Sequence, residues 1–278
     1  GFFYNAALFE DLGLKPPETY AQLIETAATL KDTGVIPFSL GALERWPAQF
    51  WFDYLLLRTA GRQYRQSLIG GQASYLDAPV VAAYQKWSTL LLQGFFNASA
   101  NDIDWAAATR MVCTGEAAMT LMGTWAIQQF IDAPCSLQEE KDFDFFPFPL
   151  INEEVEYTSI GPVDGLVVTK DSANKDAAKK LLSHFLDSKP QQAFSQGAGA
   201  FATSEDVPES VYSPFKQRIF QIITESDSWA FNYDLAASPA IADFVMDSFS
   251  ELIAFPDQYE AILTSLDGQI RNHTENVP

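Results

Sequence analysis

The sequence predicts a helix-rich α/β fold. Apolar residues recur at helical spacing through most of the chain, and short apolar runs typical of strands lie between these helical segments. The chain has 278 residues, 47% of them hydrophobic, which is enough for one large domain or two smaller ones. Because helices separate the strands and no internal repeat is present, an α/β arrangement fits better than a β-sandwich.

The first half of the chain carries helix start and stop signals. Thr19 and Gln22 form a capping box, and Gly34 ends the helix that they begin. Asp77 caps another helix, in which Tyr84 and Trp87 belong to the buried stripe. The other elements expected in this half are a strand at 36–40, a helix at 46–57 that ends near Gly61, a helix at 105–113, a strand at 117–122 and a helix from 124 to about 132.

The second half predicts two strands and several helices. Residues 144–150 contain two prolines, which confine a strand to a sheet edge or a crossover. Residues 165–169 predict a buried strand, followed by a turn and cap at 171–174. The helix after that turn has an inner apolar stripe, and two further helices close the chain. The stripe consists of Ala178, Leu181, Leu182 and Phe185.

The charge of the chain excludes two classes of partner. The net charge is −19, whereas nucleic acid and anionic membrane surfaces both select for clustered Lys and Arg. The acidic residues are spread along the sequence, which is typical of a solvated surface. No apolar run approaches the length of a membrane span, so we expect no direct span in this chain.

The chain lacks the residue patterns of common catalytic and metal sites. Its two histidines, His184 and His273, do not form a metal-binding pair, and there is no P-loop, Gly-x-Ser-x-Gly turn or Cys-x-x-Cys. We therefore expect no cofactor, no metal ligand and no catalytic residue. Cys113 and Cys135 could be two free thiols or one disulfide. The predicted helix after the strand at 117–122 doubles back and brings them together, which favours a disulfide and an oxidising compartment.

Four segments carry, in order, the motifs of one protein family. They are Tyr4-Asn5 with Leu8-Phe9, Gly13-Leu14, Pro17 and Thr19; Thr114 to Met119 with Gly123-Thr124-Trp125; Phe146-Pro147-Phe148-Pro149; and Gly161-Pro162-Val163-Asp164-Gly165 with the helix that contains Ala177-Ala178, Leu181-Leu182 and Phe185. These segments resemble the family 1 extracellular solute-binding proteins of ABC importers, the maltose-binding-protein-like group. One departure is Pro162, because the family often has two glycines here and proline removes a backbone donor.

The resemblance implies the two-lobe fold of the type II periplasmic binding proteins. It implies that residues 1–157 form the first part of the second, C-terminal lobe and that residues 158–203 are a returning portion of the first, N-terminal lobe. Residues 204–278 would supply the closing helices of the second lobe. The second lobe is then nearly complete and the first only partial, because roughly the first third of the usual protein is absent from this sequence.

The resemblance also implies a function without chemistry. We expect the protein to bind a carbohydrate, either a mono- or oligosaccharide or a glycoside, and to deliver it to the permease subunits of an ABC transporter. This places it in the periplasm or outside the cell, with a lipid anchor through an absent N-terminal segment as one form of attachment. Two alternatives stay open: a glycoside hydrolase that uses two of the many carboxylates, and a binding protein for a non-sugar solute such as a polyamine.

Sugar binding favours aromatic faces for C–H surfaces and planar polar groups for hydroxyls. Trp125 is the first candidate as a stacking platform, because it begins a helix after Gly123 and the matching family position is an aromatic residue that stacks on sugar; the alternative is a core tryptophan. The other candidates lie at positions where the resemblance implies ligand contact. They are Trp46, Gln49, Phe50, Gly161, Asp164, Trp229, Tyr233 and Asp234.

Overall fold

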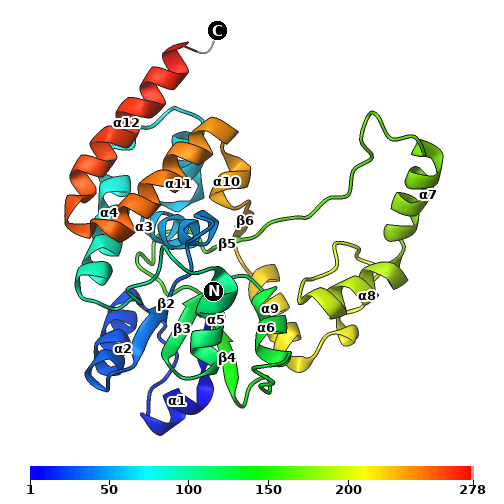
Figure 1. The fold of residues 1–278 in the computed structure, drawn as a ribbon, viewed down its shortest axis with the longest axis horizontal. Helices are drawn as coiled ribbons and strands as arrows, with labels where there is room; N and C mark the ends of the chain where they lie inside the picture. Colours follow the sequence, from blue (N-terminus) through cyan, green and yellow to red (C-terminus); the bar gives the residue numbers. More distant parts are fainter. Residues whose placement is uncertain (277–278) are drawn as a thin grey trace.

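A four-stranded sheet lies in the part of the main body that carries the N-terminus (Figure 1). Its strands are β1 (Phe2–Asn5), β2 (Ile36–Ser39), β3 (Ala117–Leu121) and β4 (Phe143–Phe146). In the computed structural model, which describes residues 1–276, their order is β2-β3-β1-β4. β1 is antiparallel to both of its neighbours, whereas β2 runs parallel to β3. All residues of β3 are buried, so this strand forms part of the core.

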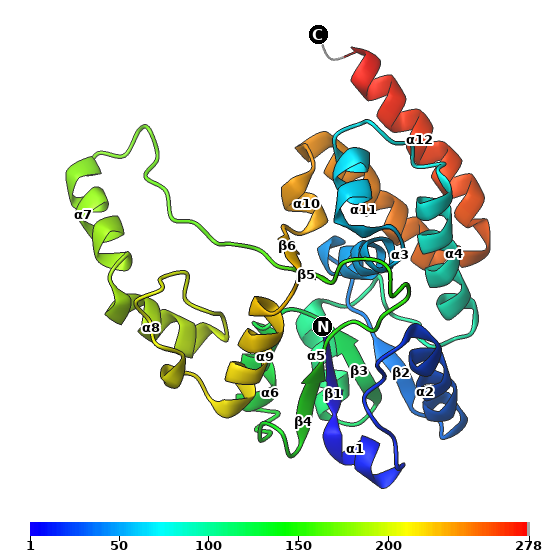
Figure 2. The ribbon, with the colours of Figure 1, turned by 180° about the vertical axis from the view of Figure 1, so that it is seen from behind.

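Helices pack beside the sheet and form a second layer next to it (Figures 1 and 2). Those of the main body are α1 (Ala6–Asp11), α2 (Tyr20–Asp32), α3 (Gln49–Ile69), α4 (Ala78–Leu92), α5 (Trp105–Cys113), α6 (Ala126–Ile131), α9 (Pro214–Thr224), α10 (Tyr233–Ala236), α11 (Pro239–Ala254) and α12 (Tyr259–Asn276), with 3-10 turns at Trp46–Ala48, Glu209–Val211 and Pro256–Gln258. The helix-rich α/β prediction is thereby confirmed. Tyr84 and Trp87 are fully buried against Phe249 of α11, as their helical spacing predicts.

The two predicted helix caps have different outcomes. At α2 the capping box is complete, because the Thr19 hydroxyl accepts from the Gln22 backbone N–H and the Gln22 side chain accepts from that of Thr19. At α4 Asp77 occupies the N-cap position, but its carboxylate accepts from the Ser74 N–H and the Tyr64 hydroxyl rather than from the helix. Asp77 therefore stabilises the preceding loop instead of the helix end.

The prediction that the helix beginning at Trp46 ends near Gly61 is confirmed, because Gly61 is non-helical, with φ 80° and ψ 172°, and interrupts α3 there. Two features were not predicted: a 3-10 turn precedes the helix, and a second helical segment follows the break and runs to Ile69. Asp53 before the break and Arg65 after it form a buried two-point ion pair, with distances of 2.5 and 2.7 Å. The pair joins the two helical segments across the break.

A second, two-stranded sheet connects the main body to an arm. β5 (Thr158–Ile160) and β6 (Ser228–Ala230) run parallel, and Arg58 of α3 donates to the Thr158 carbonyl at 3.0 Å. The chain leaves β5 as a long extended segment, forms α7 (Lys175–Phe185) and α8 (Ser188–Ala198), and returns to the body through α9 (Figure 1). We call residues 161–203 the arm.

Two predictions for the arm are wrong. Residues 165–169 form no strand, and Val167 is 84% exposed. The helix α7 is present, but none of its residues is buried and Leu181 is 56% exposed. The physical reason is a lack of partners: no strand among residues 1–276 pairs with residues 165–169, and the stripe of α7, which contacts α8, is at most half-buried.

Candidate functional site

Four aromatic side chains from three parts of the sequence form one cluster. The ring of Trp46 lies 5.9 Å from Phe50, 6.4 Å from Trp105 and 6.0 Å from Trp125, and Phe50 lies 6.1 Å from Trp125. Phe50 is buried, whereas the three tryptophans are half-buried. The cluster therefore keeps indole surface in contact with solvent, which a purely structural core would bury. We call these four residues the aromatic cluster.

Two glycines allow the backbone to approach Trp125 closely. The Trp125 ring folds back over Gly123, where an added Cβ would lie 2.2 Å from a ring carbon. Gly199, at the end of α8, has a φ of 67°, and an added Cβ there would lie 2.9 Å from the Thr124 carbonyl oxygen. Any side chain at either position would displace Trp125 or its backbone. The arm thus passes beside the start of α6.

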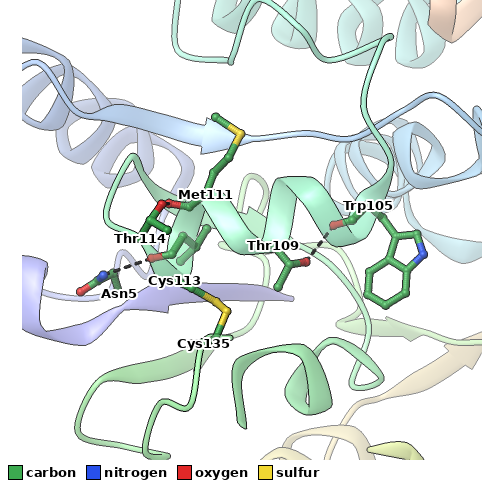
Figure 3. The surroundings of a disulfide bond; sticks show 8 residues. Asn5, Trp105, Thr109, Met111, Cys113, Thr114 and Cys135 are labelled. Atoms are coloured by element: carbon green, nitrogen blue, oxygen red, sulfur yellow. Dashed lines mark hydrogen bonds between the residues drawn. A yellow bond between two sulfur atoms is a disulfide. The ribbon is translucent and has the colours of Figure 1, made fainter. Parts of the chain in front are cut away.

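Trp105 is a cluster member for which sequence reasoning assigned no role. It begins α5 directly after Asp104, whose carboxylate caps the helix by accepting from the Ala107 N–H at 2.6 Å. The signal was available, because Trp105 and Trp125 both lie at the start of a helix. At the other end of α5, Cys113 forms a disulfide with Cys135, which follows α6, and the two Cα atoms are 5.7 Å apart (Figure 3). The bond therefore ties together the two helices that carry these tryptophans.

Unpaired polar atoms occur where α3 begins and α10 meets it. Gln49, which precedes Phe50 in the sequence, is fully buried, and its side-chain amide oxygen Oε1 accepts from the Asp234 N–H at 2.9 Å. Among the buried polar atoms without a hydrogen-bond partner in the described chain are Gln49 Nε2, Asp234 Oδ1 and Asn232 Oδ1. Leaving such an atom unpaired costs about 1–3 kcal/mol, so this group of one donor and two acceptors is suited to ligand hydroxyls or ordered water. Asn232 was not among the site residues predicted from the sequence.

The remaining predicted site residues lie elsewhere. Tyr233 is fully buried and its hydroxyl meets that of Tyr75; burial raises its pKa well above the ordinary value, so the phenol stays neutral. Gly161 directly follows β5 and half-buried Trp229 lies in β6, and an added Cβ on Gly161 would lie 3.3 Å from the Trp229 indole nitrogen. Asp164 is exposed on the arm. In the described chain, no ring contact or hydrogen bond joins these four residues to the aromatic cluster.

Among residues 1–276, no group of three or more His, Cys, Asp and Glu side chains could hold a metal ion. Over the same range, no helix combines the length and the apolar character needed to cross a membrane. The aromatic cluster, with its exposed indole surface, is the candidate ligand site.

Comparison with known proteins defines the class of this chain. Residues 1–193 match the family model for bacterial extracellular solute-binding proteins, and the chain belongs to that family. It is similar to an uncharacterized ABC transporter extracellular-binding protein of Pyrococcus horikoshii, with 28% identity over 81% of this chain and 49% of the relative. A probable sugar-binding periplasmic protein of Mesorhizobium japonicum is 25% identical over 90% of this chain and 60% of its own length. The chain thus spans about half to three-fifths of these curated relatives.

Solved structures of other proteins share this fold. One, from work on xylan utilization by the thermophilic bacterium Caldanaerobius polysaccharolyticus, superposes with a TM-score of 0.87 at 25% identity and covers 97% of this chain and 70% of its own. The bacterial solute receptor AcbH, described as preferring β-D-galactopyranose, superposes with a TM-score of 0.86 at 23% identity over 98% of this chain and 69% of its own. The fold is thereby established as that of solute-binding proteins.

Proposed function

We propose that this chain belongs to a carbohydrate-binding component of a bacterial ABC importer, which carries its ligand to the permease in the periplasm or at the outer face of the cell. The observation that carries the proposal is the aromatic cluster, whose half-buried Trp46, Trp105 and Trp125 keep indole surface exposed. The unpaired side-chain nitrogen of Gln49, the residue before Phe50, adds a polar group. Flat apolar surface beside a few convergent polar groups is the combination that a sugar ring requires.

The arm is assigned to the other side of the binding cleft. We propose that residues 158–203 are the returning part of the N-terminal lobe and that residues 1–157 and 204–278 form the C-terminal lobe. Two observations support this division: the arm leaves the body at the β5–β6 sheet, and its apolar side chains are exposed, as on a surface that packs within a longer protein. Gly161, Asp164 and Trp229 then lie where the two lobes meet, and a ligand held between the lobes could reach them after closure.

A thermal-shift screen over neutral mono- and disaccharides, with calorimetry on the hits, tests this function. A ligand that binds only the folded state raises the melting temperature by mass action. We expect Trp125→Ala to weaken binding about tenfold or more, because loss of a central aromatic contact commonly has an effect of this size. The control is Phe255→Ala, which removes an exposed aromatic side chain at the end of α11 and should leave binding unchanged.

Two outcomes would replace the proposal with another function. If the protein released shorter sugars from an oligosaccharide, as detected by chromatography, it would be identified as a hydrolase. Binding of polyamines that weakens with added salt, with no binding of neutral sugars, would identify a site for cationic ligands, since salt screens the attraction between charged partners. Neutral sugars that bind with no turnover, but equally well to Trp125→Ala, would show that the aromatic cluster is not the site.

A further inference from the structure

The turn that precedes Trp46 is strained. Arg45 has φ 64° and ψ −43°, and the Trp46 N–H donates to the Glu44 carbonyl at 2.7 Å. This is the γ-turn with positive φ, the rarer and strained of the two γ-turn forms. Positive φ is uncommon for a long side chain such as arginine. Conformations of this kind persist only where the surrounding structure holds them, and they concentrate at ligand-binding sites.

Two carboxylates from a distant part of the chain hold the Arg45 side chain. Its Nη1 lies 2.5 Å from Asp247 Oδ1 and its Nη2 lies 3.1 Å from Asp243 Oδ1. Both aspartates belong to α11 and stand one turn apart, so the two ends of one guanidinium bind one face of one helix. We call this arrangement the Arg45 fork. Its side chains are partly exposed, at 40% for Arg45 and 63–69% for the aspartates, so salt can screen it.

The residue after the strained turn is the central member of the aromatic cluster. Trp46 contacts all three other rings, whereas Phe50 and Trp125 each contact two and Trp105 contacts one. A change in the backbone at Arg45 therefore changes the direction of the ring on which the cluster depends. Asp243 and Asp247 of α11 are thus linked to the Trp46 ring through their ion pairs with Arg45 and through the peptide bond between Arg45 and Trp46.

We propose that Arg45 is a positioning residue for the ligand platform: its fork onto Asp243 and Asp247 holds the strained turn and so fixes the orientation of Trp46. The proposal rests on the proposed function for its effect on carbohydrate affinity, but the effect on Trp46 exists without any ligand. It also makes the affinity for a neutral sugar depend on salt, although the sugar itself carries no charge. Sugar affinity should fall as salt screens the fork.

Three variants and one matched control test the fork. Arg45→Ala and the double variant Asp243→Asn with Asp247→Asn both remove it. Arg45→Gly also removes it, but glycine adopts positive φ without steric penalty. The control is Glu251→Gln, which removes one charge from the next turn of α11, where no ion pair is formed in the described chain.

We expect Arg45→Ala and the double aspartate variant to weaken sugar binding about tenfold, the size of effect that release of a strained turn can produce. The salt dependence of sugar affinity that we expect in the wild type should be absent from both variants. Arg45→Gly should retain more affinity than Arg45→Ala, and Glu251→Gln should match the wild type. Near-ultraviolet circular dichroism and acrylamide quenching of tryptophan, measured without ligand, should change most in Arg45→Ala and the double aspartate variant. They should change less in Arg45→Gly and not at all in Glu251→Gln.

The spectroscopic measurements separate the two proposals. A wild type that binds no sugar but shows the expected spectral order would refute the proposed function and leave the role of the fork in place. The proposed role of the fork would be overturned if Arg45→Ala and the double variant both had wild-type spectra and sugar affinities within twofold of the wild type. A greater loss of affinity in Arg45→Gly than in Arg45→Ala would overturn it as well.

Discussion

The main body and the arm contain helices with the same kind of apolar pattern, yet only the body buries it. In α11, the side chains of Val245, Phe249 and Leu252 are fully buried. In α7, a stripe at similar spacing includes Leu181, which is 56% exposed, and no residue of that helix is buried. The period of a pattern indicates which face of a helix favours burial. It contains no information on whether the partner surface belongs to the same stretch of chain.

The arm is joined to the main body at α9, which we call the joint. Lys216 of α9 donates to the carbonyl oxygens of Ser195 and Ala200, at 2.9 and 3.1 Å, where α8 ends. On the other face of α9, Phe215 packs against Phe143 of β4 with a ring distance of 5.4 Å. The arm is therefore fixed to the body near its return, while the extended segment after β5 remains exposed. The two regions therefore differ in how far their apolar side chains are buried, and the stability of variants in each region measures this difference.

The largest expected difference comes from one chemical change made in each region. Phe249→Ala removes a fully buried ring and should lower the free energy of unfolding by about 3–5 kcal/mol. Phe194→Ala removes a ring in α8 that is 57% exposed and should change it by no more than about 0.5 kcal/mol. Urea unfolding followed by circular dichroism measures both. A similar loss in both variants would mean that the arm is packed in solution as tightly as the body.

The disulfide should stabilise the body and leave the arm unaffected. Cys113→Ser with Cys135→Ser opens a covalent loop between residues 22 positions apart in the sequence, and loop entropy predicts a loss of about 3 kcal/mol. Hydrogen exchange should become faster in α5 and α6, while amides in α7 exchange at the wild-type rate. Reduction of the wild type with dithiothreitol provides the comparison without mutation. An unchanged midpoint in both experiments would show that this bond contributes nothing to stability.

The smallest effect concerns pH at the joint. Burial lowers the pKa of Lys216 below its ordinary value of 10.5, with Glu139 acting in the opposite direction. The folded state therefore disfavours the charged amine, and this penalty disappears as the pH rises through the lowered pKa towards the ordinary one. As the pH rises towards 10.5, we expect the wild type to gain stability relative to Lys216→Met, by about 1 kcal/mol or less.

A matched variant isolates that effect from the other titrating groups. Lys189→Met removes an exposed lysine from α8 and should follow the pH dependence of the wild type. Melting temperatures of the three proteins, measured across the same pH range, are sufficient. If Lys216→Met and Lys189→Met give parallel curves, the Lys216 amine is solvated and the joint is more open than the structure shows.

Local signals in the sequence predicted much of the fold. The capping box at Thr19 and the stripe with Tyr84 and Trp87 were correct because a helix start and an apolar face depend on nearby residues. The helix end predicted near Gly61 was also correct, but the second helical segment after it was not predicted, because the Asp53–Arg65 pair that spans the break depends on both side chains being buried together. The strand expected at 165–169 was wrong because pairing requires a neighbouring strand, and the described chain offers none there.

For the candidate site, sequence reasoning selected residue types better than it selected neighbours. Trp46, Phe50 and Trp125 lie together in the structure, but the ring of Trp105 that completes the cluster comes from a helix for which no site residue was predicted. Gln49 meets Asp234 across 185 residues of chain, a separation that no local pattern can encode. Tyr233 and its neighbour Asp234 were both predicted from the sequence as ligand-binding residues. Only the fold shows that its ring points into the core.

The parallel pair β5–β6 has a consequence for the integrity of the chain. A single cut in the exposed segment that follows β5 would divide the polypeptide into two pieces of comparable length. The first piece would keep the four-stranded sheet and β5, and the second would keep β6 and the closing helices. Backbone hydrogen bonds between the strands and the Asp53–Arg65 pair, which also reaches the Phe231 carbonyl, would still join the two pieces. The cut protein would migrate as one particle in a native gel and as two fragments only after denaturation.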